Sequence, residues 1–174
     1  ELPVSPAGVP LTGPQLTWRY LLWTTAMTWR MTGVSWRAIS WLSAVFFAVR
    51  SAMKHMREGG RIVNVSSVAS QDVYAGSAHY SAAKAGVNML TRTLAHELGP
   101  KVRVNAILPG FVPTEVMMQA LQLGKDDLPA LERSLNLPAG RLGRPEDLGA
   151  AVLYLCAPAS EWVTGQCLRV AGTP

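Results

Sequence analysis

Apolar and polar residues follow a regular pattern from about residue 38 onward. A mostly apolar run continues to Met56 and predicts a helix, which the glycine pair Gly59–Gly60 brings to an end. The segment RIVNVSS (61–67) is short and rich in β-branched residues, as buried strands are. Residues 78–98 carry alanine, leucine and methionine at helical spacing, and Gly99–Pro100 is a helix-ending signal. The first half of this region therefore predicts a helix, a strand and a second helix.

The alternation continues to the end of the chain. VRVNAIL (102–108) predicts a second buried strand, and RPEDLGAAVLYLCAP predicts a helix that begins at Pro145 with acidic residues in its first turn. QCLRV (166–170) predicts a third strand. We assign no element to the polar stretch 111–144. Strands separated by helices pair in parallel, so the expected fold is a layered α/β fold.

Residues 1–37 differ from the rest of the chain. They are rich in proline and tryptophan, poor in acidic residues and without a clear period, so we leave this segment unassigned. We treat residues 38–174 as a single unit.

The composition argues against a nucleic-acid-binding, a membrane-spanning or a disulfide-rich protein. The chain has 16 Lys and Arg against 11 Asp and Glu, but the basic residues are scattered, so no nucleic-acid-binding surface is expected. The apolar stretch 41–53 contains Arg50 and is too short to span a membrane. The two cysteines, Cys156 and Cys167, imply no disulfide framework and fit a reducing compartment such as the cytoplasm.

Several polar residues cluster at the predicted strand ends. Ligands of open parallel sheets bind outside the carboxyl ends of the strands, where Ser66–Ser67 and Pro109–Gly110 are expected. Tyr80 and Lys84 are four positions apart, so they share one face of their helix. The residues beside them in SAHYSAAKAG (77–86) are small, which predicts the close approach of a flat ligand or of a second helix.

The tyrosine and lysine suit proton transfer. An ammonium about 4 Å from the phenol would favour the phenolate by up to ~4 kcal/mol, or ~3 pKa units, at an effective dielectric constant near 20. A serine hydroxyl across the crevice could hold a carbonyl or hydroxyl oxygen within reach of the phenol. Taken by itself, the pair favours a surface tyrosine beside a solvated lysine, because this spacing is common by chance.

The surrounding motifs favour the catalytic interpretation. Ser67 lies 13 positions before Tyr80, and GSAHYSAAKAG, RVNAILPGFVPT and RPEDLGAAVLYLCAPASEWVTGQ follow in order. From about Trp36 to Val170 the chain resembles the short-chain dehydrogenase/reductase family. The resemblance implies a Rossmann-like, doubly wound parallel sheet and the interconversion of a small-molecule secondary alcohol and a ketone by hydride transfer with NAD or NADP. Ser67 would hold the substrate oxygen and Tyr80 would exchange the proton. Lys84 would lower the tyrosine pKa and hold the nicotinamide ribose.

The resemblance also assigns a cofactor loop and an assembly. In PGFVPT, the Pro109–Gly110 turn, the backbone of Val112 and the side chain of Thr114 would contact the nicotinamide and a nearby phosphate. Members of the family form dimers and tetramers through helices, so we expect a homodimer or homotetramer.

Two departures from the family pattern lie on the amino-terminal side. No T-G-x-x-x-G-x-G turn precedes the first apolar helix, so the predicted Rossmann-like domain is incomplete there and its affinity for NAD or NADP is expected to be weak. Trp41 also stands where the family has a catalytic asparagine. The beginning is open to three explanations: a variant terminus, a fragment of a longer protein, or sequence altered upstream of about residue 40. A noncatalytic fragment that associates through its helices is therefore the alternative to an active oxidoreductase.

Overall fold

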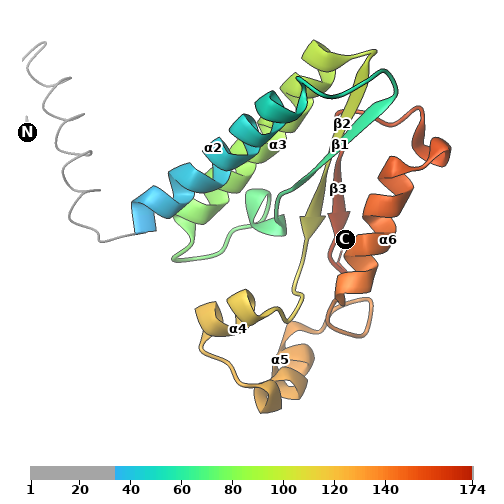
Figure 1. The fold of residues 1–174 in the computed structure, drawn as a ribbon. Helices are drawn as coiled ribbons and strands as arrows, with labels where there is room; N and C mark the ends of the chain where they lie inside the picture. Colours follow the sequence, from blue (N-terminus) through green and yellow to red (C-terminus); the bar gives the residue numbers. More distant parts are fainter. Residues whose placement is uncertain (1–33, 174) are drawn as a thin grey trace, which may run out of the picture.

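The computed structural model describes residues 34–173 as alternating helices and strands (Figure 1). In chain order the elements are α2 (Val34–Ala52), β1 (Gly60–Val65), the 3-10 helix η1 (Val68–Ser70), α3 (Ala78–Leu98), β2 (Val102–Pro109), α4 (Glu115–Leu121), η2 (Lys125–Asp127), α5 (Leu128–Leu135), α6 (Pro145–Cys156), η3 (Pro158–Ser160) and β3 (Cys167–Val170). Residues 1–33 lie outside the described residues, so the interpretation of that part of the amino-terminal segment 1–37 stays a prediction. Residues 34–37, which we left unassigned, belong to helix α2.

The three strands form one parallel sheet in the order β1-β2-β3. Ile62 pairs with Val104 on one side of β2, and Ala106 pairs with Cys167 on the other. Helices α2 and α3 cover one face of the sheet and α6 covers the other, which gives three layers (Figure 1). The predicted α/β fold with parallel strands is confirmed, and its central strand β2 is buried along almost its whole length.

The core lies between β2 and the α2–α3 pair. Val49 of α2 and Leu94 of α3 pack there against Val102 and Val104, both of which are almost completely buried. The same layer contains a satisfied polar pair, because Asn64 donates to the hydroxyl of Thr91 at 2.9 Å. Apolar packing and this hydrogen bond together hold α3 against the sheet.

The small residues of α3 allow a second helix to approach. A Cβ at Gly86 would lie 3.0 Å from Cδ2 of Leu42 in α2, which is closer than most real Cβ contacts. The sequence left two partners open for the small residues of α3, a flat ligand or a second helix. At Gly86 the partner is a helix of the same chain, α2. Close α2–α3 packing brings the residues of α2 next to the motif on α3.

Helix α3 spans Ala78–Leu98, as predicted, but the end of the preceding helix differs from the prediction. The helix expected to reach Met56 ends at Ala52. Beyond it, the amide of His55 bonds to the carbonyl of Ala52 at 2.9 Å, a tightened i to i−3 turn that leads into Gly59 with φ of +76°.

The stretch 111–144, to which we assigned no element, contains two short helices, α4 and α5. Both lie beyond the carboxyl ends of the strands (Figure 1). Among the residues that the structure describes, no helix is long and apolar enough to cross a lipid bilayer.

Candidate active site

The site is built on the carboxyl end of β1. Ser66 extends the parallel ladder, because its amide donates to the carbonyl of Ile107 at 2.9 Å. Ser67 then caps η1: its Oγ accepts the amide hydrogen of Ala69 at 3.2 Å. A serine hydroxyl has one proton to donate in addition to its lone pairs. Ser67 is only 9% exposed, and its Oγ accepts from the backbone while its own proton can still be donated to a ligand.

Tyr80 and Lys84 lie in the first two turns of α3, and both are partly buried. Nζ of Lys84 donates to the carbonyl oxygen of Val65, the last residue of β1, at 2.9 Å. It also lies 5.7 Å from the ring centroid of Tyr80, within the range of a cation–π contact. Burial lowers the pKa of Lys84, since a partly desolvated ammonium is less stable than a hydrated one.

A second hydrogen bond joins the same two elements. Oγ of Ser66 donates to the backbone carbonyl of Lys84 at 3.0 Å. Two hydrogen bonds therefore hold the end of β1 against the second turn of α3. The side chain of Lys84 makes one of them, and the side chain of Ser66 makes the other. The serine strand and the tyrosine helix have a fixed separation as a result.

Trp41 of α2 lies directly against the motif tyrosine. The two rings meet edge to face, with centroids 4.9 Å apart, and the indole also stacks on His79 at 6.3 Å. Edge-to-face contacts of this kind add about 0.5–1.5 kcal/mol beyond the area that the rings bury. At the position that the family pattern gives to asparagine, this chain has an aromatic contact with the Tyr80 ring.

The predicted cofactor loop starts where β2 ends. Pro109 closes the strand, and the amide of Gly110 donates to the carbonyl of Val170 at 3.0 Å. Val112 is buried, and its carbonyl accepts the amide hydrogen of Thr114 at 2.7 Å. Thr114 is exposed and is the N-cap of α4, where its Oγ1 accepts the amide hydrogen of Met117 at 3.3 Å. The loop is thus ordered by its own hydrogen bonds.

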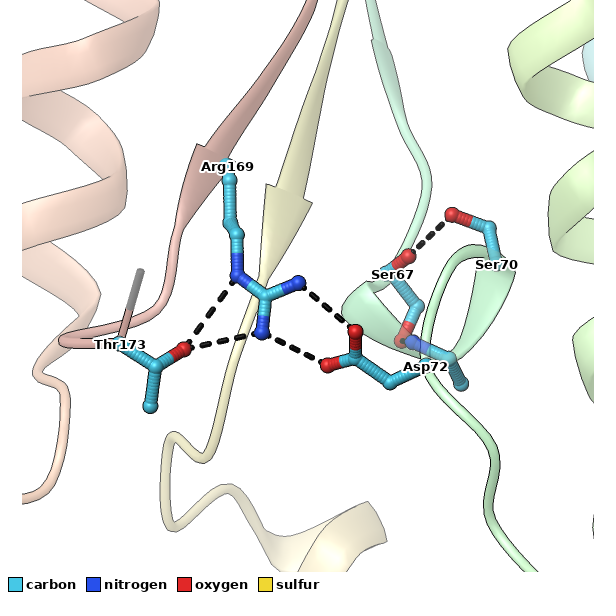
Figure 2. A network of polar contacts seen from close by, with 6 residues as sticks. Ser67, Ser70, Asp72, Arg169 and Thr173 are labelled. Atoms are coloured by element: carbon cyan, nitrogen blue, oxygen red, sulfur yellow. Dashed lines mark hydrogen bonds and ion pairs between the residues drawn. The ribbon is translucent and has the colours of Figure 1, made fainter.

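Further polar residues around Ser67 were not predicted. Asn88 of α3 donates to Oγ of Ser70. Asp72 pairs with Arg169 of β3 (Figure 2). Asn88 follows Lys84 by four positions, so it continues the helix face that carries Tyr80 and Lys84, and this spacing could have revealed it. Asp72 and Arg169 are 97 positions apart, and no local pattern connects them.

Comparison with known proteins places this geometry in a family. Residues 32–172 match the family model described as enoyl-(acyl carrier protein) reductase. The chain is 42% identical over 125 residues to the 3-oxoacyl-(acyl-carrier-protein) reductase FabG of Vibrio harveyi, covering 71% of this chain and 48% of the relative. It is 36% identical over 117 residues to the 7alpha-hydroxysteroid dehydrogenase of Escherichia coli K12, covering 66% of this chain and 44% of that enzyme.

Solved structures agree with these relatives. The NADPH-bound short chain oxidoreductase of Pseudomonas aeruginosa PAO1, described as containing an atypical catalytic center, superposes with a TM-score of 0.61 at 35% identity. The match covers 67% of this chain and 46% of that one. The chain spans about half the length of the curated relatives that it matches. With the family model matched over residues 32–172 and the motifs set on a parallel α/β sheet, this chain is a member of the short-chain dehydrogenase/reductase family.

Proposed function

We propose that this chain provides the substrate-binding and proton-transfer side of an NAD(P)-dependent oxidoreductase that interconverts a secondary alcohol and a ketone. The observation that carries the proposal is the 2.9 Å hydrogen bond from Nζ of Lys84 to the carbonyl of Val65, two positions before Ser67. This bond joins the tyrosine helix to the serine turn. The names of the relatives include a 3-oxoacyl reductase and a hydroxysteroid dehydrogenase, and the chemistry common to both is the alcohol–ketone pair.

Each of the three side chains has a distinct part in ketone reduction. The hydroxyl of Tyr80 donates its proton to the ketone oxygen as that oxygen becomes an alcohol. Lys84, with Nζ 5.7 Å from the ring centroid, stabilises the phenolate that remains. Ser67 donates its hydroxyl proton in a hydrogen bond to the same oxygen, because its Oγ is oriented by the amide of Ala69. Oxidation of the alcohol uses the same groups in reverse.

The residues of the nicotinamide side fit such a cofactor. An ammonium has three protons, and the hydrogen bond to Val65 uses one, so Lys84 retains donors for a ribose hydroxyl. Gly110 and the exposed Thr114 would lie along the cofactor, with the backbone of Val112 between them. NADH or NADPH would supply the hydride. Because the sequence contains no Gly-rich turn, we expect this chain alone to bind the cofactor weakly.

The substitution Tyr80→Phe tests the proposed proton donor. It removes one hydroxyl and keeps the ring that contacts Trp41, so the fold should persist while turnover falls by ~10²-fold or more. Turnover is followed by the nicotinamide absorbance with a panel of ketones. Tyr154→Phe is the matched control, because Tyr154 lies on α6, on the opposite face of the sheet, and is 45% exposed. A Tyr80→Phe protein with more than about a tenth of the wild-type rate would contradict the proposal.

Association through helices is the second candidate function, and one observation favours it. Phe47 of α2 is 59% exposed and Met89 of α3 is 59% exposed, although both are large apolar residues on the paired helices. We expect these helices to pair with a second copy of the chain. Light scattering at micromolar concentration should show a dimer or tetramer, and Phe47→Asp should shift it towards the monomer. A well-folded wild-type monomer would exclude this candidate.

A further inference from the structure

We propose that Asp72 and Arg169 form a clamp that positions Ser67 for proton transfer, an inference that rests on the proposed function. Ser67 is oriented by the turn that follows it. The amide and the hydroxyl of Ser70 both donate to the carbonyl of Ser67, at 3.0 and 2.5 Å, and the amide of Ala69 donates to its Oγ. Whatever fixes this turn in space therefore fixes the serine hydroxyl.

One side of the turn is attached to α3. Nδ2 of Asn88 donates to Oγ of Ser70 at 2.7 Å, and Asn88 is only 7% exposed. Asn88 lies on the same helix face as Tyr80 and Lys84, at successive intervals of four residues. This attachment sets the height of the serine turn relative to the tyrosine, and buried Val68 packs the same turn against Ala106 and Leu108 of β2.

The clamp attaches the other side of the turn to β3 (Figure 2). Nη1 and Nη2 of Arg169 donate to Oδ1 and Oδ2 of Asp72 at 2.9 and 2.7 Å. The guanidinium is itself held, because Nη2 and Nε donate to Oγ1 of Thr173 at 2.9 and 3.3 Å. A bidentate pair between planar groups fixes orientation as well as distance. Asp72 follows Ser70 by two positions, so the clamp adds a second polar attachment of this segment, to β3, beside the one that Asn88 makes to α3.

Through β3, the clamp also connects the serine turn to the predicted cofactor loop after β2. The strand β3 that carries Arg169 accepts the amide hydrogen of Gly110 through the carbonyl of Val170. Two positions beyond Asp72, the ring of Tyr74 meets the ring of Phe111 edge to face, with centroids 6.0 Å apart. The segment after Ser67 thus contacts both β3 and the loop after β2, and β3 is the common support.

Orientation, rather than stability, is the expected effect of the pair. The side chains of Arg169 and Asp72 are 24% and 33% exposed, and ion pairs with this much solvent contact contribute little to folding. A pair of the same chemistry elsewhere in the chain provides the control. Arg141 and Asp147 make two hydrogen bonds of 2.7 Å at the start of α6, on the opposite face of the sheet from α3.

The test compares Asp72→Asn with Asp147→Asn in the full chain, by steady-state kinetics with NADPH and a ketone and by hydrogen exchange of the Ala69 amide. Asp72→Asn should lower kcat by roughly ten- to a hundredfold, as small misplacements of reacting groups do, with little change in KM for NADPH. It should also speed exchange at Ala69. Asp72→Glu keeps a carboxylate and should recover part of the kcat. Asp147→Asn should leave Ala69 exchange unchanged.

Two results distinguish a failure of the proposed function from a failure of the clamp. If the wild-type chain shows no turnover with any ketone, the proposed function fails, and the exchange rate of Ala69 alone then decides whether the clamp orders the turn. If Asp72→Asn matches the wild type in kcat and matches Asp147→Asn in Ala69 exchange, the clamp has no positioning role and the inference is overturned.

Discussion

Gly110→Ala should destabilise the fold at the point where the strand β2 passes into the predicted cofactor loop. A Cβ at Gly110 would lie 2.7 Å from Cα and from Cβ of Ala171, and 3.0 Å from the carbonyl oxygen of Ala171. Two of these three atoms belong to the backbone just after β3, so rotation of a side chain cannot relieve the clash. Overpacking of this kind costs about 1–3 kcal/mol.

Gly149→Ala is the matched control for this substitution. Gly149 lies inside α6, and a Cβ there would meet nothing within 4 Å. Replacing a helical glycine by alanine should stabilise the fold by roughly 0.5–1 kcal/mol. Urea denaturation should therefore separate the two variants by roughly 1.5–4 kcal/mol in the free energy of unfolding. A Gly110→Ala protein at least as stable as the wild type, beside a normal Gly149→Ala protein, would refute the predicted clash.

Three further predictions follow from the contacts of the site and its supports. Lys84→Met should lower turnover, because it removes the cation beside Tyr80. It should not lower the free energy of unfolding at neutral pH, measured by urea denaturation, because burial disfavours the Lys84 ammonium. The hydrogen bonds from Arg169 hold the pKa of Asp72 below its ordinary value of 3.8, so the small contribution of the pair to stability is present above that pH. That stability is lost as the pH falls through the lowered pKa, and the difference in stability between the wild type and Asp72→Asn should shrink in acid. Gly86→Leu should push α2 away from α3 and lower the thermal midpoint, whereas an unchanged midpoint would mean that the Leu42 contact is dispensable.

The sequence was most informative where local patterns decide structure. The helix Ala78–Leu98 and the central strand Val102–Pro109 follow directly from apolar spacing and from the Gly-Pro and Pro-Gly signals that end them. The match to the family model over residues 32–172 confirms the family that the ordered motifs indicated. The roles of Ser67, Tyr80 and Lys84 stay predictions that the experiments above address.

Features that depend on tertiary contacts were not predictable. The clamp between Asp72 and Arg169 exists only because the sheet brings the end of β3 beside the turn after β1. Helix α4 begins at an N-cap threonine, Thr114, that the resemblance assigned to the cofactor, so the capping role was overlooked. The contact of Trp41 with Tyr80 likewise requires the close packing of α2 on α3, which the small residue Gly86 permits.

Transfer of deuterium from NADPH to the product tests the proposed reaction most directly. The full chain is incubated with a ketone and with NADPH deuterated at both positions of nicotinamide C4, and mass spectrometry then reads the label on the carbinol carbon of the alcohol. The wild type should produce labelled alcohol, and Tyr80→Phe should reduce its rate of formation by ~10²-fold or more. If the folded wild-type chain forms no labelled alcohol from any ketone tested, even at a saturating concentration of NADPH, it is not an oxidoreductase by itself.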